Sequence, residues 1–439
     1  MKKKLQQKSF IQIILIFTFI ITPGILYTAE QETPRQYEST MIHQFQEEGE
    51  SLYREEAMLG LGETDLSYGL AFYRNSNIFL NINGKLSQPF SSVQRLRFSK
   101  EMNSWAVITK RGSKYYIVTS TGKQYGPHNT AFDLKVSDNG SRFVFLQYAD
   151  KGYYFNVSDG TRLGPFDSYP YTKLTSDNWS VYSVAGNEKF ITLGSGEHFG
   201  PFPKASYPEI LLAEKGSSYV LLYYKDSMAY LDDGVQTRGP FLSVKNLSIS
   251  PNGKYWSANI TKREPVTKAL VKKLFVNTVG EIDTANDVNI VKYSKNSWGY
   301  FEKKMGVLAF VTPDGKKQML PQCSKYFNFT LADSGKFSFA CLKGKSAQGE
   351  DIEEFSVFVK GKEFGPYKYE RYAKIWFDEN GVHWAAPWYS KYGKFQGLLI
   401  DGVGVPDAKY PLYSIAAADG FYWIDIRDRA VYRNFYRYR

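Results

Sequence analysis

The sequence has 439 residues, a formal net charge of +11, and 34 tyrosines and 31 phenylalanines. This length exceeds what one simple core normally holds, which excludes a small single-core domain, and the aromatic content favours strands and large contacts between sheets. The mildly basic charge is typical of a soluble surface and does not by itself single out nucleic acid, a membrane or an anionic polymer as partner.

Residues 1–29 predict an export signal or an N-terminal membrane anchor. Four lysines within the first eight residues precede the apolar run FIQIILIFTFII at 10–21. This run is short for a spanning helix and suits the apolar core of a signal. Ala29 is a good residue to cut after, but Tyr27 lies where a second small residue is expected, so an uncleaved anchor is the alternative. We expect an exported protein of the periplasm or cell envelope, secreted or membrane-anchored, that associates with the membrane through this segment if it stays uncleaved.

Residues 30–66 are predicted to be a linker with one amphipathic helix at 36–59. Ile42, Phe45, Leu52 and Tyr53 form an imperfect apolar stripe among glutamates, and Gly49 interrupts it. Such a stripe favours a helix that packs outside the main domain or spaces it from the membrane.

A repeat of short strands begins near Tyr68 and is clearest at 245–280. There NLSIS alternates with period two, Pro251, Asn252 and Gly253 form a tight turn, and KYWSANI and KLFVNTV follow as strands. Glycine turns recur 35 to 46 residues apart, at Gly84, Gly122, Gly160, Gly196, Gly234, Gly280, Gly315, Gly361 and Gly402. A period near 40 is that of four-stranded propeller blades. The sequence therefore predicts an all-β fold, a β-propeller over 67–439.

The number of blades follows less directly from these turns. We predict eight, with seven and nine as alternatives. The first unit begins in mid-blade with GLAFYRN and NIFLNIN, and the chain ends with LYSIAAAD, GFYWIDIRD and AVYRNFYRYR. We expect the two ends to complete one blade together, which removes an exposed edge.

A glycine-proline pair followed by an aromatic residue recurs downstream of the turns, and QPF at Gln88 to Phe90 is a degenerate copy. Proline can end an outer strand that lacks a partner for its N–H, glycine permits the bend, and the aromatic residue can wedge between sheets. We predict a structural role without chemistry for Gly126 and Pro127 (followed by His128), Gly164, Pro165 and Phe166, Gly200, Pro201 and Phe202, Gly239, Pro240 and Phe241, and Gly365, Pro366 and Tyr367.

The strand-turn-strand units, of which SPNGKYW is the closest match, resemble the WD40-like repeats of TolB-type periplasmic propellers. The likeness spans about 68–439 as a pattern. It implies a rigid binding or scaffold domain that acts in the envelope.

Candidate catalytic residues are sparse. The histidines, His43, His128, His198 and His383, stand at non-repeating positions, and no GxSxG motif is present. The aspartates near turns are expected to cap backbone N–H groups, with calcium binding as the lesser alternative. We predict no catalytic residue, no metal and no cofactor.

Cys323 and Cys341 are the only cysteines. If the hairpin between them turns at Ser334 and Gly335, Cys341 lies opposite about Asn328, so the thiols are not directly cross-strand. The sequence favours free thiols. A disulfide is the alternative, if Cys323 folds back along the hairpin and the Cα atoms come within about 7 Å.

The C-terminal tail interleaves Arg433, Arg437 and Arg439 with tyrosines and phenylalanines. Such a mixture can contact a polyanion. It also suits a closing strand with arginines outward and aromatic residues between blades, which we favour. Nucleic acid is the poorer partner for an exported chain.

The leading hypothesis is an exported, noncatalytic propeller scaffold that binds a protein or cell-envelope partner through one face of the disk. Two long loops, Thr261 to Lys273 and Lys343 to Glu354, are predicted to protrude there. The alternatives are a hydrolase or lyase with a site in the central channel, and a carbohydrate-binding module. The sequence leaves the oligomeric state open.

Overall fold

The computed structural model describes residues 37–45, 50–52, 59–61, 68–100, 103–203, 205–283, 291–304, 307–345, 353–368, 374–378, 380–390, 394–406, 408–417 and 419–438. These residues belong to one compact unit, Arg35–Arg439. The predicted export segment, 1–29, lies outside them. Within the described residues no helix has the length and apolar character needed to cross a membrane.

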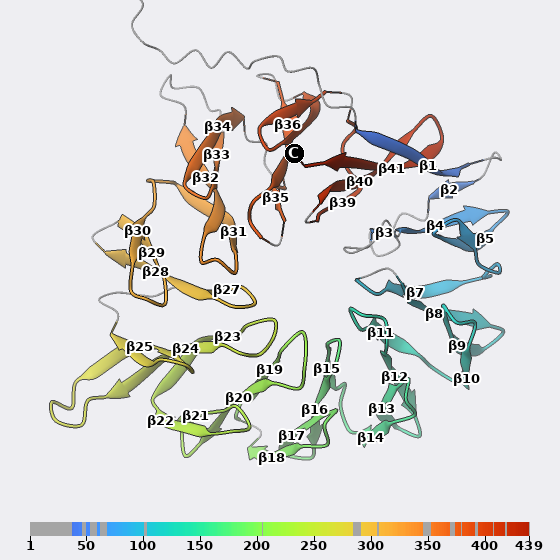
Figure 1. Ribbon diagram of the computed structural model, residues 1–439. Coiled ribbons are helices and arrows are strands. Elements are labelled where there is room, and N and C mark those ends of the chain that lie inside the picture. The colour runs from blue at the N-terminus through green and yellow to red at the C-terminus, as the bar shows by residue number, and fades with distance from the viewer. Residues whose placement is uncertain are drawn as a thin grey trace, which may run out of the picture. The chain divides into compact units, whose positions relative to one another are not determined.

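The described strands form ten antiparallel sheets, or blades (Figure 1). Blade 1 contains β2 (Ser51–Leu52), β3 (Leu59–Leu61), β4 (Tyr68–Arg74), β5 (Asn77–Ile82) and β6 (Lys85–Leu86). Blades 2 to 5 contain β7 (Val93–Phe98), β8 (Trp105–Arg111), β9 (Lys114–Thr119), β10 (Gln124–His128); β11 (Phe132–Val136), β12 (Phe143–Ala149), β13 (Gly152–Val157), β14 (Arg162–Phe166); β15 (Tyr171–Leu174), β16 (Trp179–Ala185), β17 (Glu188–Leu193), β18 (His198–Pro203); and β19 (Glu209–Leu212), β20 (Tyr219–Lys225), β21 (Met228–Asp232), β22 (Thr237–Phe241).

Blades 6 to 9 continue the series. They contain β23 (Ser243–Ile249), β24 (Trp256–Arg263), β25 (Leu270–Val276), β26 (Gly280–Asp283); β27 (Val291–Tyr293), β28 (Trp298–Lys304), β29 (Val307–Val311), β30 (Lys317–Met319); β31 (Lys325–Leu331), β32 (Phe337–Lys345), β33 (Glu353–Val359), β34 (Lys362–Lys368); and β35 (Trp376–Phe377), β36 (Trp384–Tyr389), β37 (Phe395–Ile400), β38 (Val403–Val405). Blade 10 contains β39 (Tyr413–Ala416), β40 (Gly420–Arg427), β41 (Ala430–Arg437) and β1 (Glu38–Gln44).

Buried hydrophobic clusters join each blade to the next. One cluster contains Leu80 of blade 1 and Leu96 of blade 2, and corresponding clusters occupy every later boundary. The last cluster contains Phe72 of blade 1 and Ile424 of blade 10, so the series returns to its start. Ten sheets, each too small to bury its own faces, thus share one closed circle of cores.

The helix predicted at 36–59 is wrong for the described part of that range. Residues 38–44 form β1, which pairs antiparallel with β41 and places Ser39 opposite Asn434. β2 also falls in this range, β3 begins at its last residue, and the two pair with successive stretches of β4. In β1 the backbone hydrogen bonds are made with β41 from the other end of the chain instead of within a helix. Tertiary contacts thus override the weak local propensity for a helix.

The prediction of eight blades is also wrong, as are the alternatives of seven and nine. The nine glycine turns each connect the last two strands of one blade, from Gly84 in blade 1 to Gly402 in blade 9. Blade 10 has no such turn because its outermost strand, β1, comes from the other end of the chain. The true count is therefore one more than the number of turns.

The predicted terminal strands exist, but in two different blades. GLAFYRN and NIFLNIN correspond to β4 and β5 of blade 1, whereas the C-terminal strands belong to blade 10. The expectation that one blade is completed from both ends of the chain is confirmed, but the N-terminal strand that does so is β1, not β4 or β5. The segment before Tyr68 contributes strands to both blades, which completes each of them.

The glycine-proline motif lies in the outermost strands β10, β14, β18, β22 and β34, and its five Gly–Pro peptide bonds are cis. Gly164 shows why the first position is glycine: φ is +122°, and a Cβ would lie 2.5 Å from the carbonyl oxygen of Tyr153. The aromatic residue that follows proline enters a boundary between blades, as Phe202 and Phe241 do. The motif therefore shapes the outer strand and fills the adjacent boundary.

Candidate functional site

The two edges of the blades present different faces. Because neighbouring strands are antiparallel, the turns from first to second and from third to fourth strand lie on one face, which we call the turn face. The turns from second to third strand and the connections between blades lie on the other, which we call the connection face.

The turn face is held together by polar contacts between successive blades. The Asp177 carboxylate accepts a hydrogen bond of 2.6 Å from the Gly216 N–H, and the Asn252 side chain donates to the Lys295 carbonyl over 2.7 Å. The Asn296 N–H donates to Asp333 over 2.8 Å. Burial alone would raise the pKa of Asp333, but the hydrogen bonds that it accepts outweigh this effect and lower it. Polar groups of this face thus join blade 4 to 5, blade 6 to 7 and blade 7 to 8.

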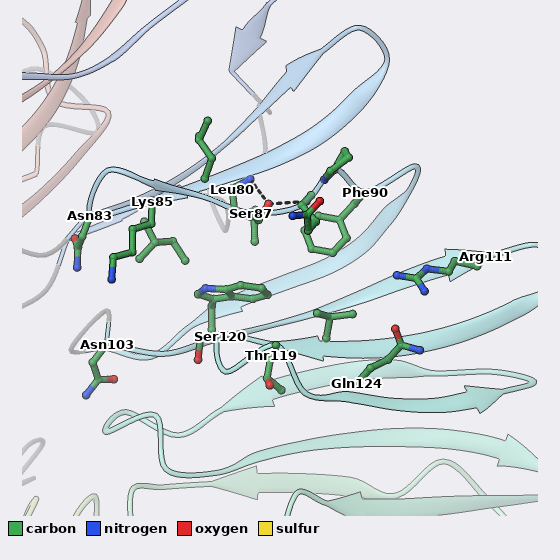
Figure 2. Close-up of a pocket in the computed structure, with 17 residues that line it drawn as sticks. Leu80, Asn83, Lys85, Ser87, Phe90, Asn103, Arg111, Thr119, Ser120 and Gln124 are labelled. Atoms are coloured by element: carbon green, nitrogen blue, oxygen red, sulfur yellow. Dashed lines mark hydrogen bonds between the residues drawn. The ribbon is translucent and has the colours of Figure 1, made fainter.

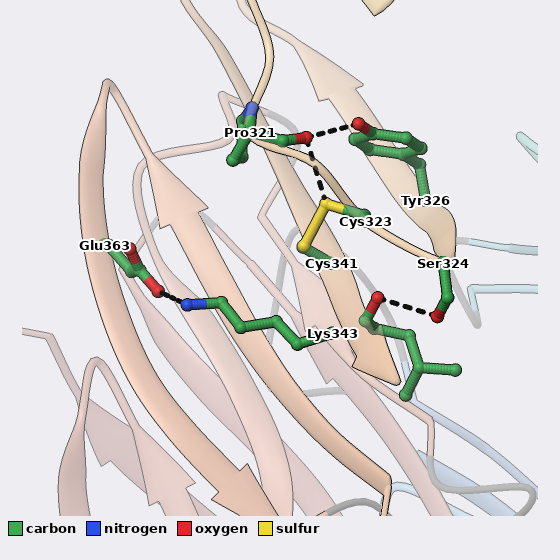
Figure 3. Close-up of a disulfide and its surroundings, with 8 residues drawn as sticks. Pro321, Cys323, Ser324, Tyr326, Cys341, Lys343 and Glu363 are labelled. Atoms are coloured by element: carbon green, nitrogen blue, oxygen red, sulfur yellow. Dashed lines mark hydrogen bonds and ion pairs between the residues drawn. A yellow bond between two sulfur atoms is a disulfide. The ribbon is translucent and has the colours of Figure 1, made fainter. Parts of the chain in front are cut away.

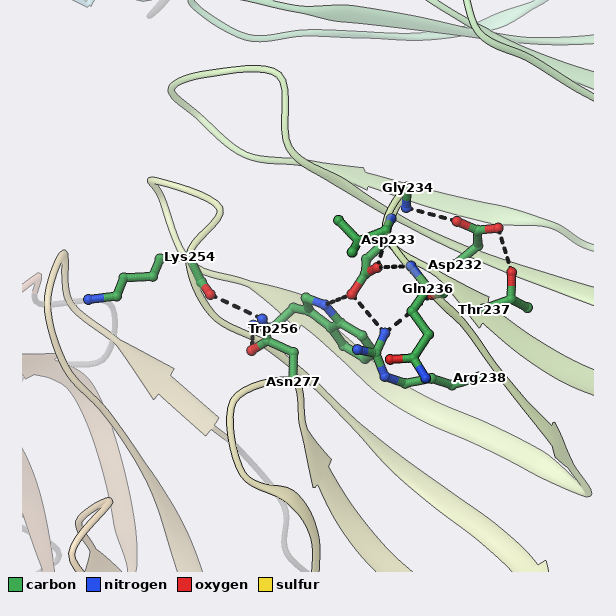
Figure 4. A network of polar contacts seen from close by, with 10 residues as sticks. Asp232, Asp233, Gly234, Gln236, Thr237, Arg238, Lys254, Trp256 and Asn277 are labelled. Atoms are coloured by element: carbon green, nitrogen blue, oxygen red, sulfur yellow. Dashed lines mark hydrogen bonds and ion pairs between the residues drawn. The ribbon is translucent and has the colours of Figure 1, made fainter.

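Asp233 anchors another contact of this kind (Figure 4). Its carboxylate lies 2.7 Å from the Arg238 guanidinium and accepts a 3.0 Å hydrogen bond from the Trp256 indole of the next blade. Burial would raise the pKa of Asp233, but these bonds and the one from the Gln236 N–H lower it. The Arg238 guanidinium also lies 5.1 Å from the Trp256 ring, so charge and ring together join blades 5 and 6.

The connection face carries the exposed aromatic residues. All six tyrosines that rank among the exposed large hydrophobic residues of the described chain lie at its turns and connections: Tyr73, Tyr148, Tyr169, Tyr171, Tyr207 and Tyr410. Three of them precede proline in a connection between blades, in the pairs 169–170, 207–208 and 410–411. We call this set the tyrosine face. The recurring Tyr-Pro pair is a signal that could have been found in the sequence, but was missed.

The tyrosine face is hollowed between blades 4 and 5. A cavity of about 340 Å³ is lined by Tyr171, Tyr182, Tyr207 and Glu209, among others. The Lys189 ammonium lies 4.2 Å from the centre of the Tyr207 ring and orients it. Tyrosines on a firm frame around a cavity of this size can receive an anchoring side chain of a partner.

Both loops that the sequence predicts to protrude belong to the connection face. Residues 261–273 end β24, turn, and begin β25, and Val266 and Leu270 are exposed there. Residues 343–354 connect β32 to β33, although 346–352 lie outside the described residues. The long spacings between glycine turns therefore arise from insertions on this one face.

The histidines lie in four different blades. His383 and Asp401 are 2.8 Å apart, and burial raises the pKa of Asp401. This carboxylate also accepts the N–H of Trp384, as Asn277 accepts that of Trp256 three blades earlier. The pair is therefore the local form of a repeated turn cap. Among the described residues, no three His, Cys, Asp or Glu side chains gather as a metal-binding group.

Two lysines of the innermost strands are engaged with neighbouring blades. The Lys135 ammonium donates to the Thr172 carbonyl over 2.6 Å, and the Lys173 ammonium donates to the Ile210 carbonyl over the same distance. Burial lowers the pKa of Lys173. These contacts tie blade 3 to 4 and blade 4 to 5.

Cys323 and Cys341 form a disulfide with Cα atoms 5.5 Å apart, against the preference for free thiols (Figure 3). The expected register was wrong by two residues. The turn centres on Ser334 rather than between Ser334 and Gly335, which shifts the pairing by one, and a bulge after Phe327, where Asn328 adopts a φ of +51°, shifts it by another. Cys341 consequently lies opposite Tyr326, near enough for Cys323 to reach it.

The C-terminal tail forms β41, which lies between β40 and β1. Arg433 pairs with Thr40 of β1, and its guanidinium lies 6.0 Å from the Tyr68 ring of blade 1. Arg437 is exposed, and Arg439 lies outside the described residues. The tail thus has the position of a closing strand, and a polyanion contact stays an untested prediction.

A second cavity, of about 580 Å³, lies between blades 1 and 2 (Figure 2). Its lining comes from β5 and β6 with the chain that follows them, and from β8, β9 and β10 with their turns. The sequence did not indicate it.

Comparisons with known proteins give only distant likenesses. No protein-family model and no curated protein sequence matches the chain. The structure of a eukaryotic initiation factor is similar at 11% identity over 74% of this chain and 91% of that one, with a TM-score of 0.42. The Dos1 propeller is similar at 11% identity over 69% and 92%, with a TM-score of 0.31. The β-propeller domain of the trilobed protease from Pyrococcus furiosus is similar at 10% identity over 74% and 99%, with a TM-score of 0.28. The chain is a β-propeller, and these likenesses carry nothing about its activity.

Proposed function

We infer that the chain is an exported, noncatalytic propeller scaffold that binds a protein or another cell-envelope component through the tyrosine face. One observation carries this inference: every strongly exposed tyrosine of the described residues lies on the connection face. Tyrosine is enriched in protein interfaces because its ring buries apolar area while its hydroxyl stays hydrogen-bonded.

The contrast between the two faces supports the choice. Polar groups of the turn face are engaged in joining blades, as Asp177 and Asp233 are. The connection face instead offers exposed rings, the insertion at 261–273 and the cavity beside Tyr171 and Tyr207. A rigid ring holds these features at fixed separations, so little conformational entropy is lost when a partner binds.

The test is a pull-down from solubilised cell envelope with the propeller as bait. The variant Y171S/Y207S removes the two rings at the rim of the cavity, and V235S/V279S is the matched control, since both valines are exposed at turns of the other face. We expect the tyrosine variant to lose the partner that the wild type and the control retain. Equal recovery by both variants, or loss by the control alone, contradicts the proposal.

The export part of the proposal has its own test. Fractionation of cells that express the full-length chain should place it outside the cytosol, because of residues 1–29. A cytosolic distribution contradicts this part and leaves the binding face to be judged by the pull-down.

A further inference from the structure

The second strand of each blade from 2 to 9 begins with an aromatic residue that is covered in every blade but one. Seven of these residues are at most 7% exposed, and the exception, Trp105, is only half-buried. The eight residues are Trp105, Phe143, Trp179, Tyr219, Trp256, Trp298, Phe337 and Trp384. The aromatic residue of blade 2 is therefore less covered than its equivalents in blades 3 to 9.

Blade 2 receives Phe90, whose ring centre lies 6.5 Å from that of Trp105. It lacks the second large side chain that the outer strand of the preceding blade supplies to blades 3 and 5. Three residues after the glycine turn, Tyr125 contacts Phe143 with ring centres 4.9 Å apart. Phe199 contacts Tyr219 in the same way, at 5.5 Å. The residue three after Gly84 is Ser87, which is too short to cover Trp105.

The local backbone explains why a small residue occupies this position. β6 has only two residues, after which the chain departs from the regular ladder and pairs again at Phe90, opposite Ile78. The Ser87 hydroxyl accepts a 3.0 Å hydrogen bond from the Leu80 N–H at this departure. A phenylalanine here would lose that bond and fill the cavity of about 580 Å³ above Trp105.

The lining of this cavity is aromatic, amide-rich and cationic. Lys85 and Arg111 contribute positive charge, and no aspartate or glutamate lines it. Figure 2 shows these two cations near opposite ends of the labelled lining, with the amides of Asn83 and Gln124 beside them. Neither cation makes an ion pair with any described residue.

We propose that the cavity between blades 1 and 2 binds an acidic oligosaccharide. The Trp105 ring offers a flat surface to the C–H face of a sugar ring, and amides pair with hydroxyl groups. Cations at both ends suit carboxylates or sulfates that recur along a chain, since Arg and Lys bind such anions by charge-assisted hydrogen bonds. This site is separate from the tyrosine face and does not depend on a partner there.

The test measures binding of tetrasaccharides by calorimetry and tryptophan fluorescence. The acidic probes are oligomers of hyaluronan, polygalacturonate and alginate, and chitotetraose is the neutral probe. We expect the affinity for at least one acidic probe to exceed that for chitotetraose by about tenfold or more. The double variant K85Q/R111Q should abolish this difference.

Two further variants separate the site from a general effect on folding. S87F places a large side chain in the cavity, and W105A removes the aromatic surface. Each should weaken binding of the acidic probe about tenfold or more. Y125F alters the equivalent position at the filled boundary between blades 2 and 3 and should bind as the wild type does. The proposal is overturned if no acidic probe binds, if neutral and acidic probes bind equally, or if a folded S87F protein binds unchanged.

Discussion

Removing the buried side chains of Ile42 in β1 and Phe45 just after it should open the ring between blades 10 and 1. Ile42 and Phe45 are each 8% exposed and lie in the cluster that contains Leu70 of blade 1 and Val431 of blade 10. The double variant I42A/F45A leaves the backbone of β1 able to pair with β41. It removes the two large side chains from the core between blades 10 and 1.

The expected loss of stability can be worked from these contacts. Deleting a buried Ile side chain costs about 2–5 kcal/mol and a buried Phe side chain about 3–5 kcal/mol. Because β1 lies at the outer edge of its sheet and can relax, we take the lower part of each range and expect about 5 kcal/mol together. This approaches the whole stability of an ordinary domain, about 5–15 kcal/mol.

Guanidinium denaturation followed by tryptophan fluorescence measures this loss. The matched control is T40A/M41A in the same strand, since both side chains are exposed. We expect a large fall in the midpoint for I42A/F45A and a small one for T40A/M41A. Size-exclusion chromatography should also show association of I42A/F45A through the uncovered edge of β41. Equal midpoints for the two variants would refute the assignment of β1 to the closing blade.

Three further outcomes are expected. D233N should lower the free energy of unfolding by about 1–2 kcal/mol at neutral pH, because a charged acceptor for Arg238 is removed. Since the pKa of Asp233 is lowered in the folded protein, this stability difference from wild type should be complete above the ordinary pKa of aspartate. It should disappear as the pH falls through the lowered pKa and the carboxylate is protonated. The two cysteines of the disulfide are 18 residues apart in the sequence. Its reduction should lower the free energy of unfolding, measured by denaturation, by about 3 kcal/mol, and the reductant should not change the stability of C323A. G164A should destabilise by about 2 kcal/mol or more, and G160A by about 1 kcal/mol, since both have positive φ but only the added Cβ at 164 meets a carbonyl oxygen.

The repeated part of the fold could be predicted because its signals are local. The alternation in Leu247 and Ile249, the turn at Gly253 and the outer-strand motif at Gly239 each depend on a few adjacent residues. All three mark strands and turns where they stand in the structure.

The blade count and the closing strand could not be predicted because they depend on contacts between distant segments. β1 buries only Ile42 and His43 among its seven residues, so it carries no clear period of two. The disulfide was misjudged for a related reason, since the exact centre of the turn and the bulge beside Asn328 each shift the register by one residue, and the hairpin sequence reveals neither.

The candidate sites were within reach of the sequence only in part. The Tyr-Pro pairs at 169, 207 and 410 could have been found as a repeat, but their common face follows from strand order. Likewise, the sequence shows that Ser87 stands three residues after its glycine turn, as Tyr125 and Phe199 do after theirs. Its consequence depends on knowing that this position covers the aromatic residue of the next blade.

Cross-linking of β1 to β41 tests the closure of the ten-blade ring most directly. Met41 and Tyr432 are paired across these strands, and paired Cα atoms of antiparallel strands lie within disulfide reach. The variant M41C/Y432C should form the new bond in mass mapping under oxidising conditions, whereas M41C/R433C, offset by one residue, should not. Absence of the bond in a folded M41C/Y432C protein, or equal bonding in both variants, would contradict a ring closed by the two ends of the chain.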